Sequence, residues 1–220
     1  MRTLAIGDIH GCLTALETLI DYIKPSKNDT VVTLGDYIDR GPDSKGVIDY
    51  IIKLKETHQV ITLKGNHELM IKDALNSKDE LFFWLINGGD SAVQSFDIQS
   101  LDQLPKKYWA FFDQCSLYHE TDHHILVHAG LHPELPCDKQ NIEYLCWQRI
   151  LDTKPHYSGK KIICGHTPQI NGLPLHLNHA ICIDTHVFGD QWLTCLDIES
   201  GEYWQANKLG ETRKSHINEL

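Results

Sequence analysis

The first part of the chain alternates short apolar runs with amphipathic segments. Apolar runs at residues 4–6, 31–34 and 60–63 each end in a polar turn that contains glycine, which is typical of buried strands. Between them, residues 13–23 and 44–55 place apolar side chains at helical spacing. Because strands joined by helices of this length run in the same direction, this order predicts a parallel β-α-β-α-β unit.

The pattern becomes helical after residue 68 and then changes again. Residues 68–114 are rich in aromatic side chains and are interrupted at Gly88, Gly89 and Pro105, which predicts a packed helical insert. The second half predicts two antiparallel hairpins, one helix and two apolar strands. These elements are expected at residues 116–128 and 192–206 (hairpins), 141–151 (helix), and 161–164 and 180–183 (strands). The polar end, residues 208–220, is expected to fray.

Composition narrows the classes of protein. A length of 220 residues favours a single domain, residues 1–220. A formal charge of -10 without a basic run argues against a nucleic-acid partner. The chain has no signal-peptide pattern and no apolar window of membrane-spanning length, so we expect a soluble, cytoplasmic protein with no membrane partner. The seven cysteines are scattered, without Cys-x-x-Cys, and are expected to be reduced.

Five of the turns that follow apolar runs carry histidine, acidic or amide side chains beside glycine. They read GDIHG (7–11), GDYIDRG (35–41), GNHE (65–68), HAG (128–130) and GHTP (165–168). Each one alone is typical of a capped turn. Since strand ends of parallel sheets gather at one edge, we expect the five to cluster, and such a cluster is electrostatically costly without a cation. Oxygen and imidazole donors without thiolate favour manganese, iron or zinc over calcium.

The motifs GDxHG, GDxxDRG and GNHE, in this order, resemble the phosphoprotein-phosphatase class of calcineurin-like metallophosphoesterases. The segments WLINGGDSAVQSF, LYHETDHHILVHAGLHP, ICGHTP and IDTHVFGDQWLTCLDIESG are similar to the compact bacterial and phage serine/threonine protein phosphatases. The resemblance extends from residue 1 to about residue 204. It implies an α/β fold, a four-layer sandwich of two mixed β-sheets flanked by helices.

The resemblance also implies a site for two divalent metal ions, with manganese expected first and iron, zinc or nickel as alternatives. One ion would be held by Asp8, His10 and Asp36, and the other by Asp36, Asn66, His128 and His166. In dinuclear hydrolases a shared ligand holds two ions about 3.5–4 Å apart, and a bridging hydroxide attacks the substrate in line.

Four further residues receive roles from the resemblance. Arg40 and Arg149 would grip the phosphoryl oxygens with their guanidinium groups. His67 would protonate the leaving alkoxide, with Asp39 bound to its other nitrogen and raising its pKa. The bacterial pattern usually has glycine where this chain has His186, which is expected to be a loop residue or a neighbour of the site.

Three functions remain open from the sequence. The first is hydrolysis of phosphomonoesters on phosphorylated serine or threonine side chains of a protein or peptide. The second is symmetrical diadenosine tetraphosphate hydrolysis; those enzymes share the motifs but usually read GNHD and are longer, whereas this chain reads GNHE at residues 65–68. The third is a catalytically inactive phosphate-binding module, a class that normally lacks ligands present here. The sequence does not predict the oligomeric state.

Overall fold

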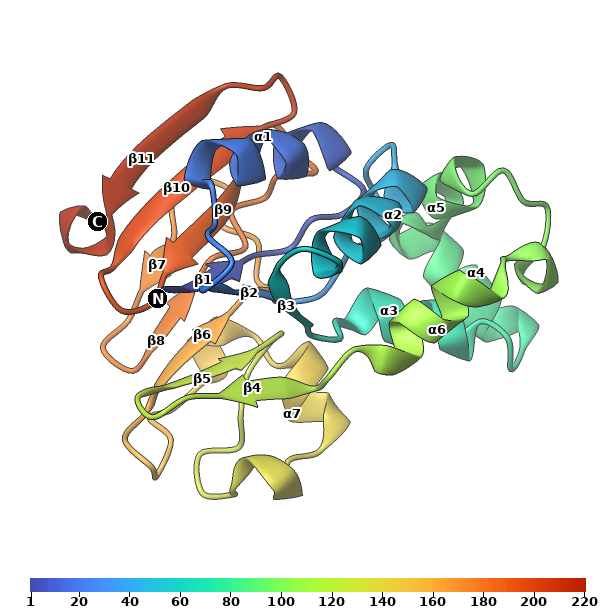
Figure 1. The fold of residues 1–220 in the computed structure, drawn as a ribbon. Coiled ribbons are helices and arrows are strands. Elements are labelled where there is room, and N and C mark those ends of the chain that lie inside the picture. The colour runs from blue at the N-terminus through green and yellow to red at the C-terminus, as the bar shows by residue number, and fades with distance from the viewer.

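The computed structural model describes residues 1–220, which form two mixed β-sheets flanked by helices (Figure 1). The first sheet has the strand order β11-β10-β9-β1-β2-β3. Its strands are β1 (Thr3–Ile6), β2 (Thr30–Thr33), β3 (Gln59–Thr62), β9 (Trp192–Asp197), β10 (Glu202–Asn207) and β11 (Thr212–His216). The second sheet has the order β4-β5-β6-β8-β7. Its strands are β4 (Tyr118–Glu120), β5 (His124–Val127), β6 (Lys161–Cys164), β7 (Leu175–His176) and β8 (Ala180–Cys182).

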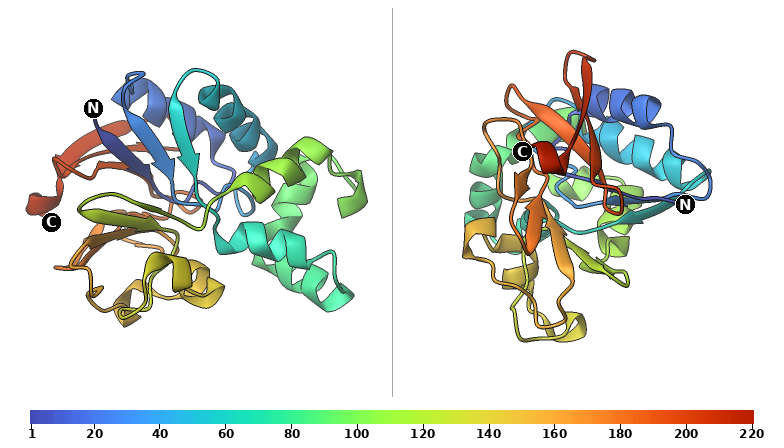
Figure 2. Two further views of the ribbon diagram at one scale, coloured as in Figure 1. Left: turned by 60° about the horizontal axis from the view of Figure 1, so that its bottom comes forward. Right: turned by 90° about the vertical axis from the view of Figure 1, so that its left-hand side faces the viewer.

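The predicted parallel unit is confirmed. Strands β1, β2 and β3 pair in parallel and are connected by α1 (Leu13–Ile23) and α2 (Ser44–Lys55), which lie together over one face of the first sheet (Figure 2). Helix α2 begins after Asp43, whose side chain accepts a hydrogen bond from the backbone N–H of Gly46. Both predicted hairpins, β4–β5 and β9–β10, are antiparallel.

Alternate residues of the strands face different cores. Ala5 and Val32 point into a core of 11 buried residues between the sheets, whereas Leu4 and Val31 join a larger core under α1 and α2. In the second sheet Leu126 faces the inner core, and its chain neighbours face a third core, against which α7 (Ile142–Trp147) packs. The strands β1, β2, β5 and β6 are therefore buried on both faces, which explains their mostly apolar sequences.

The predicted helical insert is also present and lies to one side of the sheets (Figure 1). It contains α3 (Asn66–Asp73), α4 (Lys78–Trp84), the π-helical turn η1 (Leu85–Gly89), α5 (Asp90–Ser95), the short 3₁₀ turn η2 (Leu101–Gln103) and α6 (Lys106–Gln114). Gly88 interrupts the helical backbone with a φ of 105°, a value that glycine adopts readily. Its carbonyl accepts a hydrogen bond from the backbone N–H of Arg40 at 3.1 Å, so the insert contacts the loop after β2.

In the second half, the predicted helix is present but shorter than expected, and the prediction for the end of the chain was wrong. The helix expected at residues 141–151 is only α7, after which residues 148 and 149 are extended and a 3₁₀ turn, η4 (Ile150–Asp152), follows. The end of the chain does not fray, because β11 pairs with β10 along its whole length and leads into a last 3₁₀ turn, η5 (Ile217–Glu219). Polar and charged residues are common in edge strands. The polar composition of β11 therefore did not indicate a strand. No helix has the length and apolar character needed to cross a membrane.

Candidate active site

The predicted metal ligands meet where strands of both sheets end. Asp8 and His10 follow β1, Asp36 follows β2, and Asn66 begins α3 after β3. The second sheet contributes His128 after β5 and His166 after β6. All six side chains are buried.

One group of these side chains is centred on Asn66 and Asp36. Nε2 of His128 and Nδ1 of His166 each lie 3.0 Å from Oδ1 of Asn66. Nε2 of His128 also lies 3.5 Å from Oδ1 of Asp36. The ligand atoms of His128, His166 and Asp36 all lie within 4.8 Å of one another, which is close enough to contact a single ion.

Backbone carbonyls orient the three histidines. In each ring one nitrogen contacts a carbonyl oxygen, so the other nitrogen is turned toward the site. The contacts join Nδ1 of His10 to Ile38 (2.9 Å), Nδ1 of His128 to Leu34 (2.9 Å), and Nε2 of His166 to Trp147 (3.1 Å). A ring held in this way has a fixed tautomer and presents a lone pair.

These histidines are neutral at neutral pH, which is the form that binds a metal ion. Burial lowers the pKa of His128 and of His166 to about 3, and it lowers that of His10 well below its usual value. Neutral His128 donates from Nδ1 to a carbonyl, so its Nε2 is an acceptor that faces the acceptor oxygen of Asn66. Buried lone pairs that face one another are unfavourable without a cation between them. The residues present therefore fit a divalent cation.

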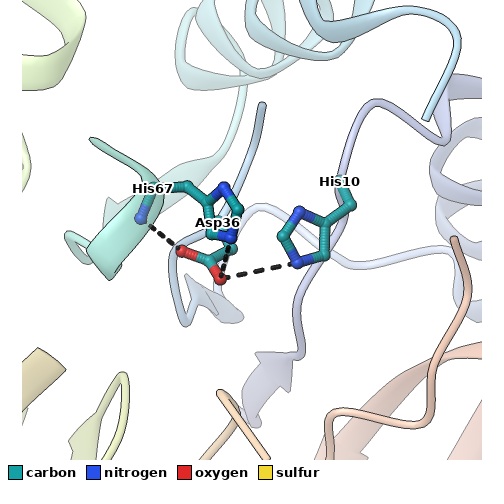
Figure 3. Close-up of side chains that lie close together, drawn as sticks. All are labelled: His10, Asp36 and His67. Atoms are coloured by element: carbon teal, nitrogen blue, oxygen red, sulfur yellow. Dashed lines mark hydrogen bonds and ion pairs between the residues drawn. The ribbon is translucent and has the colours of Figure 1, made fainter. Parts of the chain in front are cut away.

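A second group consists of His10, Asp36 and His67 (Figure 3). Oδ2 of Asp36 lies 3.5 Å from Nε2 of His10 and 3.9 Å from Nε2 of His67. The other oxygen of Asp36 accepts a hydrogen bond from the backbone N–H of His67 at 3.1 Å. Asp36 thus belongs to both groups, as the prediction of a shared ligand requires. Asp8 is not a member of this group; both of its oxygens accept from the backbone N–H of His166, at 3.0 and 3.2 Å.

His67 has the partner that the sequence predicts, but not the predicted pKa. Its Nδ1 lies 2.6 Å from Oδ2 of Asp39, and the same oxygen accepts the indole N–H of Trp84 at 2.9 Å. Burial lowers the pKa of His67 to about 4 although the charge of Asp36 opposes the shift. Burial also raises the pKa of Asp39 well above its usual value, so the expected rise in the pKa of His67 is not found. Nε2 of His67 is buried and has no hydrogen-bond partner.

Glu68, the last residue of GNHE, anchors the loop after β2. Its carboxylate accepts backbone N–H groups of Asp36, Tyr37 and Gly65, each at 2.9 Å. Burial raises the pKa of Glu68 to about 8, while these three bonds oppose the rise. The side chain is fully buried, so it fixes the backbone from which Asp36 projects.

The site also concentrates backbone strain. Eight non-glycine residues have a positive φ, and five of them are predicted site residues. These five are His10 (45°), Asp36 (52°), Asp39 (72°), Arg40 (67°) and His166 (62°). Each such residue carries a conformational cost that persists only where the surrounding structure enforces it. The strain is thus concentrated at the edge where the predicted ligands meet.

Glycine is required where the backbone approaches the carboxylates. A Cβ at Gly65 would overlap with Oδ1 of Asp36, and one at Gly165 would overlap with Oδ1 of Asp8. The glycines beside the ligands therefore allow close approach, which is the reason that the sequence suggests for them.

Both predicted phosphate-binding arginines line a cavity of about 160 Å³ beside the two groups. Its lining comprises Asp36, Arg40, Asn66, Asn87, Trp147, Arg149, His166 and Pro168. Arg149 follows α7 in extended backbone and donates to the carbonyl of His166 at 3.1 Å. Arg40 and Arg149 are both exposed, and Nη1 of Arg40 lies 3.1 Å from Nε2 of His10.

The phenyl ring of Phe188 supports this edge and was not singled out by the sequence. The guanidinium carbon of Arg40 lies 4.6 Å from the ring centroid. His10 packs edge-on against the same ring at 5.0 Å, and His186 does so at 4.4 Å. His186 has a φ of 62°, which explains why the similar pattern has glycine there. It is a neighbour of the site through Phe188.

Three other residues of the site were missed from the sequence, namely Trp84, Glu68 as an anchor, and Asp184. Glu68 had a local signal, since a residue at the third helical position can cap the helix start. Trp84 and Asp184 had none. Burial raises the pKa of Asp184 to about 7, and burial together with the charge of Asp184 raises the pKa of Asp8 well above its usual value.

Comparison with known proteins identifies the family to which this chain is similar. The family model of calcineurin-like phosphoesterases matches residues 1–191. The chain is 31% identical to serine/threonine-protein phosphatase 1 of Salmonella typhimurium, over 74% of this chain and 77% of that protein. It is 28% identical to the asymmetrical bis(5'-nucleosyl)-tetraphosphatase PrpE of Oceanobacillus iheyensis, over 87% of this chain and 86% of that protein.

A solved structure shows the same fold. A crystal structure of a putative diadenosine tetraphosphatase superposes with a TM-score of 0.68 and 20% sequence identity, covering 98% of this chain and 93% of that one. At this identity the likeness concerns the fold alone.

Proposed function

The chain belongs to the calcineurin-like phosphoesterases, whose family model covers residues 1–191, and from this premise we propose that it hydrolyses phosphomonoesters of serine and threonine side chains. As a member it is a metallophosphoesterase, a hydrolase of a family that uses a dinuclear site for divalent metal ions, and it has two groups of side chains that could hold such ions. The type of substrate and the residues that act on it are our proposal.

The observation that carries the proposal is one small cavity shared by cation ligands and two arginines. Asp36, Asn66 and His166 line it together with Arg40 and Arg149. Its volume is about 160 Å³. A phosphoryl group that enters it would meet both kinds of side chain, while the rest of the substrate would lie outside.

In this proposal the cations are held by Asp8, His10 and Asp36 on one side and by Asp36, Asn66, His128 and His166 on the other. When bound, they would activate a water for attack and neutralise charge on the phosphoryl oxygens. Manganese is our first choice of metal, because the donors are carboxylate, imidazole and amide groups.

The remaining groups would bind the ester and move a proton. Arg40 and Arg149 would each offer paired N–H donors to the phosphoryl oxygens, which suits the planar guanidinium. His67 would give the proton on Nε2 to the departing alkoxide oxygen, since this nitrogen is buried, unpaired and close to Asp36. Asp39, bound to Nδ1, would hold the ring in position and favour its protonated form when substrate is bound.

A second candidate, hydrolysis of a dinucleoside tetraphosphate, is favoured by a specific observation. A relative of that name, PrpE, matches 87% of this chain, a larger part than the phosphatase of Salmonella typhimurium does. The chain is 31% identical to the protein phosphatase and 28% identical to PrpE, and this difference is too small to decide between the two substrates. The GNHE motif at residues 65–68 supports our first choice, since symmetrical diadenosine tetraphosphate hydrolases usually read GNHD.

Initial rates on three substrates test the proposal. The chain is freed of metal, supplied with manganese, and assayed on a phosphoserine peptide, diadenosine tetraphosphate and p-nitrophenyl phosphate, with Asp36→Asn as the inactive control. We expect the phosphopeptide to be preferred over the dinucleotide. A large preference for the dinucleotide would replace the first function with the second. No turnover of any substrate with manganese, nickel, zinc or iron would favour a catalytically inactive phosphate-binding module.

A further inference from the structure

Asp184 follows β8 at the same distance at which His166 follows β6. The two strands are parallel with Cys182 opposite Cys164, and the backbone N–H of Ile183 continues the pairing to the carbonyl of Cys164 at 2.8 Å. Asp184 and His166 each follow this register pair by two residues, so they lie side by side at the same sheet edge. This edge is where the cation ligands gather.

Asp184 also lies against the segment that carries Asp8. A Cβ at Gly7 would overlap with the carbonyl oxygen of Ile183 and would lie 3.4 Å from the backbone nitrogen of Asp184. The residue after Gly7 is Asp8, so the backbones that bear the two carboxylates are in direct contact.

One oxygen of Asp184 has a structural partner and the other has none. Oδ1 accepts a hydrogen bond from the backbone N–H of His186 at 3.2 Å, which closes a turn of the kind that aspartate commonly makes. Oδ2 is buried without any hydrogen-bond partner, in a residue that is 1% exposed. A buried carboxylate oxygen is expected to be paired, and the turn explains only Oδ1.

No basic side chain supplies the missing partner. Asp184 forms no ion pair with any lysine, arginine or histidine. With Asp8 and Asp36 it makes three buried carboxylates at one sheet edge. Burying three like charges together is unfavourable unless a cation compensates them.

We propose that Asp184 is a seventh residue of the cation site, where its free Oδ2 supplies negative charge and an acceptor to the ion held by Asp8, His10 and Asp36. The proposal rests on the cation site described above. It adds one residue of this chain to the ion on the Asp8 side and leaves the ion on the Asn66 side unchanged.

Manganese binding by the metal-free chain tests this inference. Asp184→Asn is the informative variant, because its amide oxygen can still accept from His186 while the free oxygen becomes an N–H₂ group. Asp197→Asn is the matched control: Asp197 is 5% exposed and makes a similar turn by accepting from the backbone N–H of Glu199 at 3.1 Å, but it lies at the end of β9 outside the site. Calorimetric titration with manganese chloride gives stoichiometry and affinity without any turnover.

We expect the wild type and Asp197→Asn to bind two manganese ions with equal affinity. Asp184→Asn should bind one of the two about 10- to 100-fold more weakly, the usual effect of losing a supporting residue of a metal site. Unchanged binding of both ions by Asp184→Asn would overturn the inference while leaving the proposed function intact. A wild-type chain that binds no manganese would instead contradict the proposed function.

The stability of the metal-free variant provides a second criterion. If the three carboxylates are clustered for a cation, removing one of them relieves repulsion, and metal-free Asp184→Asn should melt at the same temperature as the metal-free wild type or higher. An unfolded Asp184→Asn variant would show that the carboxylate is needed for the fold itself and would overturn the inference.

Discussion

Trp84 donates its indole N–H to Oδ2 of Asp39 at 2.9 Å, and the same oxygen lies 2.6 Å from Nδ1 of His67. Trp84 belongs to the helical insert, 45 residues away from Asp39 along the chain. It is fully buried, and a Cβ at Gly89 would overlap with its ring. The insert therefore positions Asp39 through Trp84, and Asp39 in turn positions His67, the residue proposed to donate the proton.

Replacing Trp84 with phenylalanine should lower kcat and leave KM nearly unchanged. The variant removes the N–H and keeps an aromatic ring, and the bond would contribute about 1.5–3 kcal/mol when Asp39 is charged, the form that stabilises protonated His67. We expect a fall in kcat of about tenfold or more, measured on a phosphoserine peptide. Trp109→Phe is the control, since Trp109 lies in α6 and packs against Phe112. Equal losses in both variants would point to packing rather than to the bond with Asp39.

Replacing His67 with asparagine should affect substrates according to their leaving groups. Loss of a general acid costs about 10²- to 10⁴-fold in rate, and we expect this loss for a phosphoserine peptide, whose alkoxide needs a proton. p-Nitrophenyl phosphate releases a much more stable anion and should lose far less. Rates on both substrates at equal manganese concentration measure the difference. Equal losses, together with one fewer manganese ion bound, would make His67 a ligand rather than an acid.

Replacing Phe188 with alanine should raise KM for the phosphopeptide several-fold. The ring lies under the guanidinium of Arg40 at 4.6 Å, and contacts of this type contribute about 0.5–2 kcal/mol. Without the ring Arg40 would be less well ordered for phosphate binding. Phe188→Tyr keeps the aromatic face and should restore KM. A tyrosine variant as impaired as the alanine variant would contradict a cation–π contribution to binding.

Asp29 should make the stability of the fold depend on pH in the acid range. Burial favours its protonated form, but hydrogen bonds from Arg2 and Ser26 hold the pKa of Asp29 well below its usual value. A lowered folded-state pKa contributes stability above the unfolded value of about 3.9, and this contribution is lost as the pH falls. Asp29→Asn should therefore unfold at lower urea concentration than wild type at pH 7, and the gap should narrow below about pH 4.

The matched control for this pH dependence is Asp21→Asn, since Asp21 is exposed and forms no hydrogen bond or ion pair through its side chain. Its urea midpoint should follow the wild type at every pH. A gap between wild type and Asp29→Asn that stays constant down to pH 2 would contradict the assignment.

Features with a local signal were predictable from the sequence. The strands β1, β2 and β3 contain the predicted apolar runs, and α1 and α2 begin and end at the predicted residues. The ligands follow strands and stand beside glycine, so the common edge of the sheets follows from strand direction. The calcineurin-like resemblance implied two mixed sheets flanked by helices, which the fold confirms.

Features that depend on contacts between distant segments were not predictable. The bond from Trp84 to Asp39 and the contact of Phe188 with Arg40 join side chains from separate parts of the chain, and neither leaves a periodic pattern. The strand β11 is polar and was mistaken for a frayed end, because its order comes from pairing with β10 rather than from burial. The sequence predicts that Asp39 raises the pKa of His67, but burial of the imidazole outweighs this effect and lowers the pKa.

The central claim is that Asp36 joins the two groups of ligands into one site for two cations. It is tested most directly by counting the manganese ions that remain bound to wild type and to Asp36→Asn after equilibrium dialysis of the metal-free proteins. We expect two ions for each wild-type chain and fewer than one for the variant, since both groups lose the negative charge that they share and only one oxygen remains at this position. Two ions retained by Asp36→Asn would contradict the claim.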